Sequence, residues 1–373
     1  MDKPKNRWDV AAILLTTFLA AAIAVPAYGI SHGFAPALWG WFAVLVLWNG
    51  LSITAGYHRL WSHRSYEAHA SVRLFFALGG ALSLQNSILQ WCSNHRRHHR
   101  FVDDLDHDPY SARRGLLFSH VGWMLKDYPA SAFDPDNVKD LRRDPIVEWQ
   151  SRHYWVLAAS MNIGLPILLG AFAGDMIAGF LLLGVLRLVV CHHTTFFINS
   201  LAHAFGRQPY SDESTARDNG LIALLTYGEG YHNFHHTFQW DYRNGIRWYH
   251  FDPTKWLIRG LSLCRLAWQL KTVAPERIEQ AVVAMQLKRT TERISRFQPI
   301  NTQQWLELIE TEYEKLISTL NEWAKCRQAA LALSRERLIE KWEHTELHDR
   351  LQQLEAELEF QRRQWRLLTR QFA

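Results

Sequence analysis

Histidines occur in four groups within residues 58–236, and their spacing suits metal binding. The second group reads H-R-R-H-H and the last reads H-N-F-H-H, so both follow the pattern H-x-x-H-H. On an α-helix, positions i, i+3 and i+4 lie on one face, so each such group can direct three imidazoles toward one small volume. The nine histidines of the four groups are His58, His63, His95, His98, His99, His203, His232, His235 and His236.

The number and type of these side chains indicate two metal ions rather than one. Imidazole nitrogen suits Zn, Cu, Fe and Ni. A structural zinc site has four ligands and often includes cysteine, but the 4 cysteines of this chain form no C-x-x-C pair. Nine nitrogens exceed the coordination of a single ion. Two ions with open positions are therefore expected, and open positions combined with redox chemistry favour iron over zinc.

The first pair of histidines leaves two arrangements open. His58 and His63 are five residues apart, which corresponds to about 140° of rotation in an α-helix. Their rings then diverge and serve two different metals, or the helix loosens at this end. Asn199 precedes His203 by four residues, so these two side chains share a helical face.

The residues outside this pattern give less support for a metal site of another kind. A carboxylate-bridged helical bundle uses paired E-x-x-H motifs, and only one copy, Glu229 to His232, is present here. Histidines outside the four groups are interpreted as ordinary surface or core residues. Those near the groups are candidates to hydrogen-bond the ring nitrogen of a ligand that does not bind the metal. They are His107, His120, His192 and His193.

Membrane helices are expected to carry or flank these histidines. Four apolar segments of about 20 residues are long enough to cross the hydrocarbon core. Lys and Arg precede the first segment and fill residues 57–153, whereas the two short connections contain none, so both termini, the middle segment and the tail are expected in the cytosol. The first segment is interpreted as a retained helix because a second one follows at once. The segments are about 10–30, 35–56, 154–173 and 176–198.

Two further regions complete the organisation. The apolar run 72–89 contains Gly79-Gly80 and several polar residues, and a fifth crossing would separate the histidine groups, so a helix in or under the interface is expected. From about residue 275 the chain is charged and amphipathic, with Pro299 between two helical stretches and a coiled-coil-type helix at 338–368. The predicted domains are 1–270, holding the membrane helices and a cytosolic cap, and 275–373, a cytosolic helical extension.

The motifs H-R-L-W-S-H, H-R-R-H-H, N-S-L-A-H and G-E-G-Y-H-N-F-H-H resemble the histidine boxes of membrane fatty-acyl desaturases of the stearoyl-CoA type, over about residues 10–265. The resemblance implies an all-α membrane protein with four transmembrane helices, a cytosolic helical cap and a histidine-rich di-metal site. It also implies O₂-dependent insertion of a cis double bond, typically at the ninth carbon of an acyl chain. Two irons would be held by the nine histidines listed above, with Asn199 completing the shell through a water.

The substrate's carrier group stays open. Ser93-Asn94 stand where animal acyl-CoA members commonly carry Arg-Asp, so acyl-CoA, a membrane lipid and an acyl carrier protein are all alternatives. Tunnel-lining aromatic residues and phosphate-binding basic residues are expected near the metals. The candidates for substrate contact are Trp91, Asn86, Phe196, Arg113, Arg114 and Lys126, with Trp123 and Phe197 as further lining residues.

The tail has no haem-binding signature, so a separate electron donor of the ferredoxin, rubredoxin or cytochrome type, with its reductase, is expected. The tail itself is interpreted as self-packing or as a route to a homo-oligomer, and alternatively as a docking platform for a partner. A bacterial inner membrane is the expected location. Nucleic acid is not expected as a partner, because the sequence has no basic face with interleaved aromatic residues. The alternatives are a lipid hydroxylase on the same scaffold and a membrane zinc-binding or metal-transfer protein, which needs polar residues inside the spans.

Overall fold

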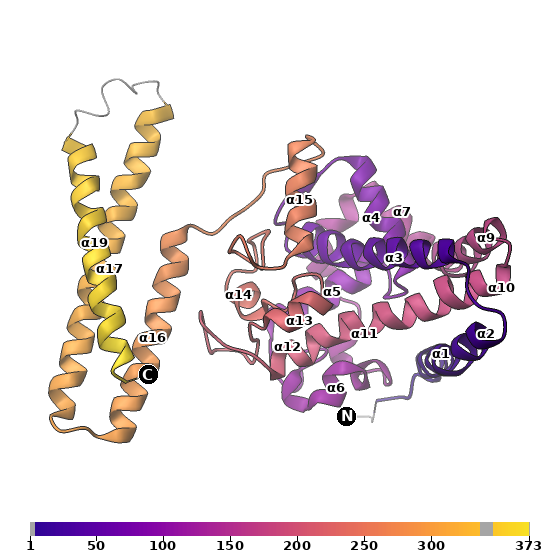
Figure 1. Cartoon of the computed structure of the whole chain (residues 1–373), viewed down its shortest axis with the longest axis horizontal. Coiled ribbons are helices and arrows are strands. Elements are labelled where there is room, and N and C mark those ends of the chain that lie inside the picture. Colours follow the sequence, from indigo (N-terminus) through magenta and orange to yellow (C-terminus); the bar gives the residue numbers. More distant parts are fainter. Residues whose placement is uncertain (1–3, 336–345, 373) are drawn as a thin grey trace. The chain divides into compact units, whose positions relative to one another are not determined.

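The computed structural model describes residues 4–335 and 346–372, and most of them are helical. The chain folds as two units, drawn in Figure 1, and each unit is described by itself. The first comprises Met1–Gln208 and Glu213–Thr272, and the second comprises Pro209–Asp212 and Val273–Ala373. The predicted all-α membrane class is confirmed.

Four helices of the first unit are long and apolar enough to cross a membrane, and they run Trp8–Ser31, Pro36–Ser62, Tyr154–Phe172 and Met176–Ala204. Large apolar side chains such as Phe172 and Trp155 stay exposed on them, as expected for surfaces that face lipid. The chain is therefore an integral membrane protein. The second and fourth helices extend past their predicted ends and carry His58 and His203 within the same helical rod.

Each of these helices contains a π-helical or irregular segment. The first is α1 (Trp8–Leu19), η1 (Ala20–Ala24) and α2 (Val25–Ser31); the second is α3 (Pro36–Leu51) and η2 (Ser52–Ser62). The third is α8 (Tyr154–Ala159), η8 (Ser160–Gly164) and α9 (Leu165–Phe172). The fourth is α10 (Met176–Gly179), η9 (Phe180–Leu186), α11 (Arg187–Asn199) and α12 (Leu201–Ala204).

The apolar run after the second span forms a short helix, α4 (Ala70–Leu82), of 13 residues. At 1.5 Å per residue it measures about 20 Å, too short for a hydrocarbon core of about 30 Å. It packs closely on η2, because a Cβ at Gly80 would lie 2.1 Å from the ring of Tyr57. The next helix, α5 (Ile88–Arg100), therefore starts on the same side of the membrane as η2 and carries the H-R-R-H-H motif.

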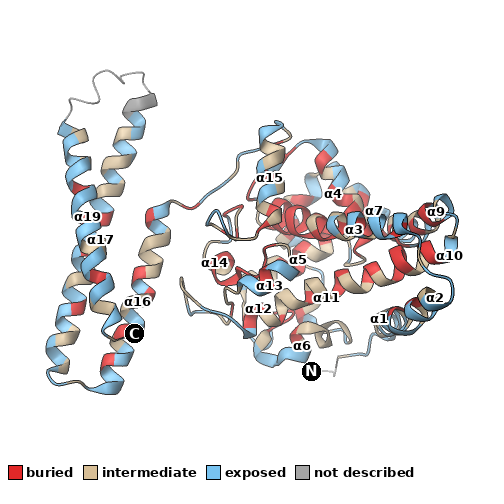
Figure 2. Cartoon of the chain, in the orientation of Figure 1, coloured by how far each residue is buried: buried red, intermediate tan, exposed pale blue. Residues whose placement is uncertain are grey.

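The remaining elements of the first unit form a cap over the ends of the spans. Short helices and turns dominate it, and two strands, β1 (Glu67–Ala68) and β2 (Ala267–Trp268), pair antiparallel. Buried residues concentrate where η2, α4 and α5 meet (Figure 2). The other cap elements are η3 (Ala112–Arg114), α6 (Leu116–His120), η4 (Gly122–Met124), η5 (Pro129–Ser131), η6 (Asp136–Val138), η7 (Leu141–Arg143), α7 (Pro145–Arg152), α13 (Gly220–Leu225), α14 (His232–Thr237) and α15 (Pro253–Leu263).

The second unit contains three long described helices, α16 (Pro275–Phe297), α17 (Thr302–Arg335) and α19 (Glu346–Arg370). Pro299 lies between the first two, as predicted, and residues 338–345 of the predicted last helix lie outside the described residues. Apolar side chains at helical spacing pack together, as amphipathic helices require. This core contains Val283, Ile309, Leu316, Leu320, Leu358 and Trp365.

Candidate metal centre and cavity

The π-helical segment η2 decides how the first two histidines lie. The His63 N–H donates to the His58 carbonyl at 3.0 Å, an i→i+5 bond that is the defining contact of a π-helix. Residues five apart then stand almost above one another, and the two ring centroids are 4.8 Å apart. Of the two arrangements that the sequence left open, the loosened helix is the one observed.

The nine histidines form two groups, and within each group the nitrogen atoms lie within 4.8 Å of one another. The first group is His58, His63, His95, His99 and His235; the second is His98, His203, His232 and His236. Both α5 and α14 contribute to both groups. Each H-x-x-H-H motif therefore serves two metal positions, not one.

The ring nitrogens converge as metal ligands do. The Nε2 atoms of His58 and His235 are 3.0 Å apart, and those of His63 and His95 are 2.9 Å apart. In the second group, the Nε2 atom of His232 lies 3.1 Å from that of His203 and 3.1 Å from that of His236. Facing lone pairs at such distances are satisfied by a shared cation, so the donor set fits two metal ions.

Burial also keeps these rings in the form that binds metal. Removal from water, followed by the positive potential of neighbouring imidazoles, lowers the pKa of six of the histidines well below the usual value. A neutral imidazole offers a free lone pair, whereas a protonated one does not. The six are His63, His95, His99, His232, His235 and His236.

A second layer of polar side chains binds the opposite ring nitrogen. The Nδ1 atom of His98 lies 2.9 Å from Asp108 Oδ1, and that of His203 lies 2.9 Å from the Thr215 hydroxyl. Thr215 in turn donates to Asp103 Oδ1 at 2.7 Å. Such partners fix the tautomer and leave Nε2 for the metal. Sequence reasoning missed all three, and the acid-rich stretch just after His99 was the available signal for the two aspartates.

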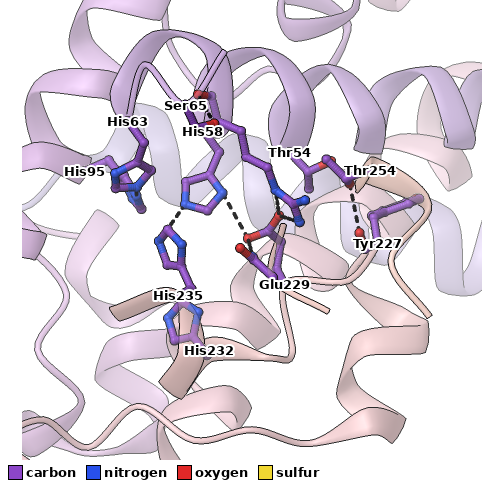
Figure 3. Close-up of polar contacts among 12 residues, drawn as sticks. Thr54, His58, His63, Ser65, His95, Tyr227, Glu229, His232, His235 and Thr254 are labelled. Atoms are coloured by element: carbon purple, nitrogen blue, oxygen red, sulfur yellow. Dashed lines mark hydrogen bonds and ion pairs between the residues drawn. The ribbon is translucent and has the colours of Figure 1, made fainter. Parts of the chain in front are cut away.

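Glu229 holds His58 in the same way. Its Oε2 atom lies 2.9 Å from His58 Nδ1, and its Oε1 atom accepts from Arg59 Nη2 at 2.8 Å. Burial raises the pKa of this carboxyl, but His58 and Arg59 outweigh burial and lower it to about 2. The Arg59 guanidinium also donates to Asp252 Oδ2 at 3.1 Å. Figure 3 shows Glu229 and His235 on two sides of the His58 ring.

A cavity of about 390 Å³ reaches this centre from one side. His58, His95, His98 and His232 line it, together with Asn199. Some lining residues, such as Ile53 and Thr54, are buried, whereas others are exposed and include both apolar and charged side chains. The exposed lining residues include Arg7, Asp9, Lys126 and Asp127.

The predicted substrate residues divide into two sets. Those in the cavity wall are Asn86, Trp91, Trp123, Lys126 and Phe196. Arg113 and Arg114 are not among the lining residues: both are exposed, and the Arg114 guanidinium lies 3.7 Å from the centroid of the Phe118 ring. Phe197 is also outside the lining, where its ring lies beside that of His120.

The four histidines considered as supporting donors bind elsewhere. His120 Nδ1 lies 2.9 Å from the Ser200 hydroxyl, and its Nε2 lies 3.1 Å from His193 Nδ1. His192 Nε2 donates to the Ser83 carbonyl at 3.1 Å, and His107 lies against Asp104 on the surface. None of these hydrogen bonds is to a member of the two groups.

Sequence reasoning also missed the amino-terminal segment as part of the cavity. The Arg7 N–H donates to the Leu125 carbonyl at 2.9 Å, and the Asp127 N–H donates to the Lys5 carbonyl at 2.8 Å. This backbone pairing holds Arg7 beside the loop that carries Lys126. The two segments are far apart in the chain, so no local sequence pattern predicts such a pairing.

Comparison with known proteins agrees with this geometry. The model of the fatty acid desaturase family matches residues 34–265. The chain belongs to the fatty acid desaturase family. This desaturase-family chain is 47% identical over 247 residues to acyl-CoA desaturase 1 of Saccharomyces cerevisiae, covering 66% of this chain and 48% of that protein.

Two further relatives of this desaturase chain show how far the similarity extends. It is 45% identical to the probable acyl-CoA desaturase of Schizosaccharomyces pombe, covering 66% of this chain and 52% of that protein. It is 36% identical to stearoyl-CoA desaturase 5 of Bos taurus, covering 65% of this chain and 73% of that protein. The chain thus spans about half the length of the two fungal relatives. The resemblance inferred from the histidine boxes is confirmed.

Proposed function

We propose that this chain is an O₂-dependent fatty-acyl desaturase that inserts a cis double bond, at the ninth carbon, into a saturated acyl chain. The observation that carries the proposal is the cavity whose wall includes histidines of both groups. A substrate in this cavity lies against both metal positions at once. The relatives named acyl-CoA and stearoyl-CoA desaturases support acyl-CoA as the substrate class. Residues 1–270 would form the catalytic domain and 275–373 an extension.

We assign two irons to the two histidine groups, with Asn199, which also lines the cavity, completing the shell through a water. Iron with O₂ supplies the power to remove hydrogen from an unactivated methylene, which no side chain can do. The protein's own contribution is positional. Glu229 and Asp108 orient the ligand rings, and the buried inner wall excludes water and holds the acyl chain next to the metals.

The exposed outer end of the cavity is assigned to the carrier group of the substrate. Arg7 and Lys126 supply positive charge there for phosphate oxygens, and Asp9 and Asp127 are available to polar groups. The apolar inner wall, which includes Trp91 and Phe196, is assigned to the acyl chain. Electrons would come from a separate redox protein, and both termini and the cap would face the cytosol.

The test compares wild type with His98→Ala in the same host membranes, with fatty acids profiled by gas chromatography and double-bond positions assigned. A cis-monounsaturated product with wild type and none with the variant is expected, together with about two irons per purified wild-type chain. Hydroxylated chains would support a hydroxylase instead. Native zinc without iron and without any product would overturn the enzyme assignment.

A further inference from the structure

Helix α4 ends among the membrane spans, and side chains from three spans bind its carboxyl end. A helix leaves its last four carbonyl groups without intrahelical partners, and the hydrocarbon region offers no water to satisfy them. Asn49 donates to the Gly79 carbonyl at 3.4 Å, Asn162 to that of Ala81 at 3.1 Å and Arg187 to that of Leu82 at 2.6 Å. His192 donates to the carbonyl of Ser83, the first residue after the helix, at 3.1 Å. We call these four residues the α4 cap.

Arg187 holds the α4 cap together. Its guanidinium is completely buried and donates to Asn49 Oδ1 at 2.9 Å and to Asn162 Oδ1 at 2.6 Å. Both amides are thereby turned so that their NH₂ groups face the α4 carbonyls. Among residues 4–335 and 346–372, no carboxylate pairs with this guanidinium. The partial negative charge at the C-terminal end of α4 interacts with the guanidinium in place of a carboxylate.

A charge inside a membrane span is costly and commonly marks a substrate path. Here the path is close, because the turn that follows α4 enters the cavity. Leu84, Gln85 and Asn86 all line the cavity. Leu84 has φ 51° and Asn86 has φ 76°, a left-handed conformation that residues with a Cβ rarely adopt. Backbone strain of this kind persists only where surrounding contacts impose it.

The turn is held on both sides. On the side away from α4, the Asn86 N–H donates to the Tyr154 hydroxyl at 2.9 Å. On the near side, Arg187 and His192 fix the carbonyls of Leu82 and Ser83. Gln85 then reaches across the cavity wall, where its Nε2 donates to the Thr195 hydroxyl at 2.9 Å. The position of this wall therefore depends on the α4 cap.

We propose that Arg187 is a positioning residue that sets which carbons of the acyl chain lie at the metals, by holding the turn 83–87 in place. The inference rests on the proposed desaturase function. Arg187 does not touch the metal groups, so its loss is expected to move the double bond along the chain and not only to lower the yield. A shift of about 1 Å in a bound substrate is sufficient to change rates about 100-fold.

The experiment compares Arg187→Met and Arg187→Lys with the control Arg73→Met. Arg73 lies on α4 itself and binds Asp144 outside the cavity. The readout is the ratio of double-bond positional isomers, which is independent of yield. About a tenfold rise in the minor-to-major ratio is expected for Arg187→Met. A smaller rise is expected for Arg187→Lys, because a single ammonium replaces the planar fork. Arg73→Met is expected to keep the wild-type ratio.

Amide hydrogen exchange supplies a readout without turnover. Exchange at residues 83–87 is expected to accelerate in Arg187→Met and not in Arg73→Met. If Arg187→Met does not accumulate, Asn162→Ala, which removes one anchor of the guanidinium, takes its place. Unchanged isomer ratios and unchanged exchange in variants that retain iron would overturn the inference. A wild type without unsaturated product would instead refute the proposed function, while the exchange result would still show whether Arg187 holds the turn.

Discussion

At the scale of single residues, the proposed metal ligands depend on side chains outside the two histidine groups. In four of the nine histidines, Nδ1 lies within hydrogen-bonding distance of a carboxylate or hydroxyl oxygen: His58, His95, His98 and His203. Ring orientation is thereby fixed before any metal arrives, which reduces the cost of assembling the site. The buried charge of Glu229 is balanced by Arg59 in the same network. Removing Glu229 leaves Arg59 with Asp252 as its remaining buried counter-charge.

Glu229→Gln is expected to lower iron affinity by about 10- to 100-fold, as changes in such supporting partners generally do. The neutral amide cannot serve His58 and Arg59 as the carboxylate does, and it leaves the buried guanidinium short of one counter-charge. Iron content after dialysis against a chelator measures the effect. Glu67→Gln is the matched control, because Glu67 lies exposed on β1. Equal iron retention in both variants would contradict the role assigned to Glu229.

Lys126→Ala is expected to raise KM for acyl-CoA about three- to tenfold with little change in kcat, since an exposed charged contact contributes about 1 kcal/mol. Arg113→Ala serves as the control from outside the cavity lining and is expected to keep the wild-type KM. Steady-state kinetics with the purified enzyme and its donor give both constants. A larger effect from Arg113 than from Lys126 would place the carrier group elsewhere.

At the scale of elements, two departures from regular α-helix build the site. The π-helical η2 brings His58 and His63 to one metal position, and the early end of α4 at Leu82 leaves room for the turn that lines the cavity. Both depend on close packing between α4 and η2, where Gly79 and Gly80 let the two backbones approach. The contact is therefore expected to tolerate no added methyl group.

Gly80→Ala is expected to destabilise the protein by about 1–3 kcal/mol, because its Cβ would overlap the Tyr57 ring and force the two helices apart. The measurement is thermal unfolding of the detergent-solubilised protein. Gly164→Ala is the matched control, since a Cβ there meets nothing within 4 Å, and it is expected to be neutral or stabilising. Equal melting temperatures for the two variants would show that α4 and η2 can separate without cost.

At the scale of the whole molecule, the proposed chemistry lies in the first unit. The family match at 34–265 ends before α16, and both histidine groups lie within it. The second unit buries apolar faces of α16, α17 and α19 on one another. Its role in oligomerisation or in docking a partner stays a prediction.

The proposed orientation of the molecule is tested by labelling cysteines. Cys264 is exposed at the end of α15, while Cys92 and Cys191 are buried. In a Cys326→Ser background, a membrane-impermeant maleimide is expected to label Cys264 only after cells are permeabilised. Adding Ser31→Cys, at the end of the first span, is expected to give labelling in intact cells. The reverse labelling pattern would contradict the proposed orientation and indicate the opposite one.

The four spans and the nine histidines could be predicted from the sequence, because span length, charge in the connections and H-x-x-H-H spacing are local properties of the chain. The extra reach of two spans into the cap was not predicted, since helix ends follow packing as well as composition. Arg187, Asn49 and Asn162 were passed over inside apolar segments. Their partners are the α4 carbonyls, which only the folded chain brings to them.

The assignment of histidines to two groups was likewise decided by the tertiary structure. Sequence spacing gives angles on one regular helix, but His58 and His63 share a group because their helix is π-helical, and α5 and α14 each divide their rings between the groups. Asp103 supports His203 only through Thr215, which lies 112 residues away in the chain. The residue types and local periodicity thus determined the chemistry and the membrane helices, whereas long-range packing decided which atoms meet.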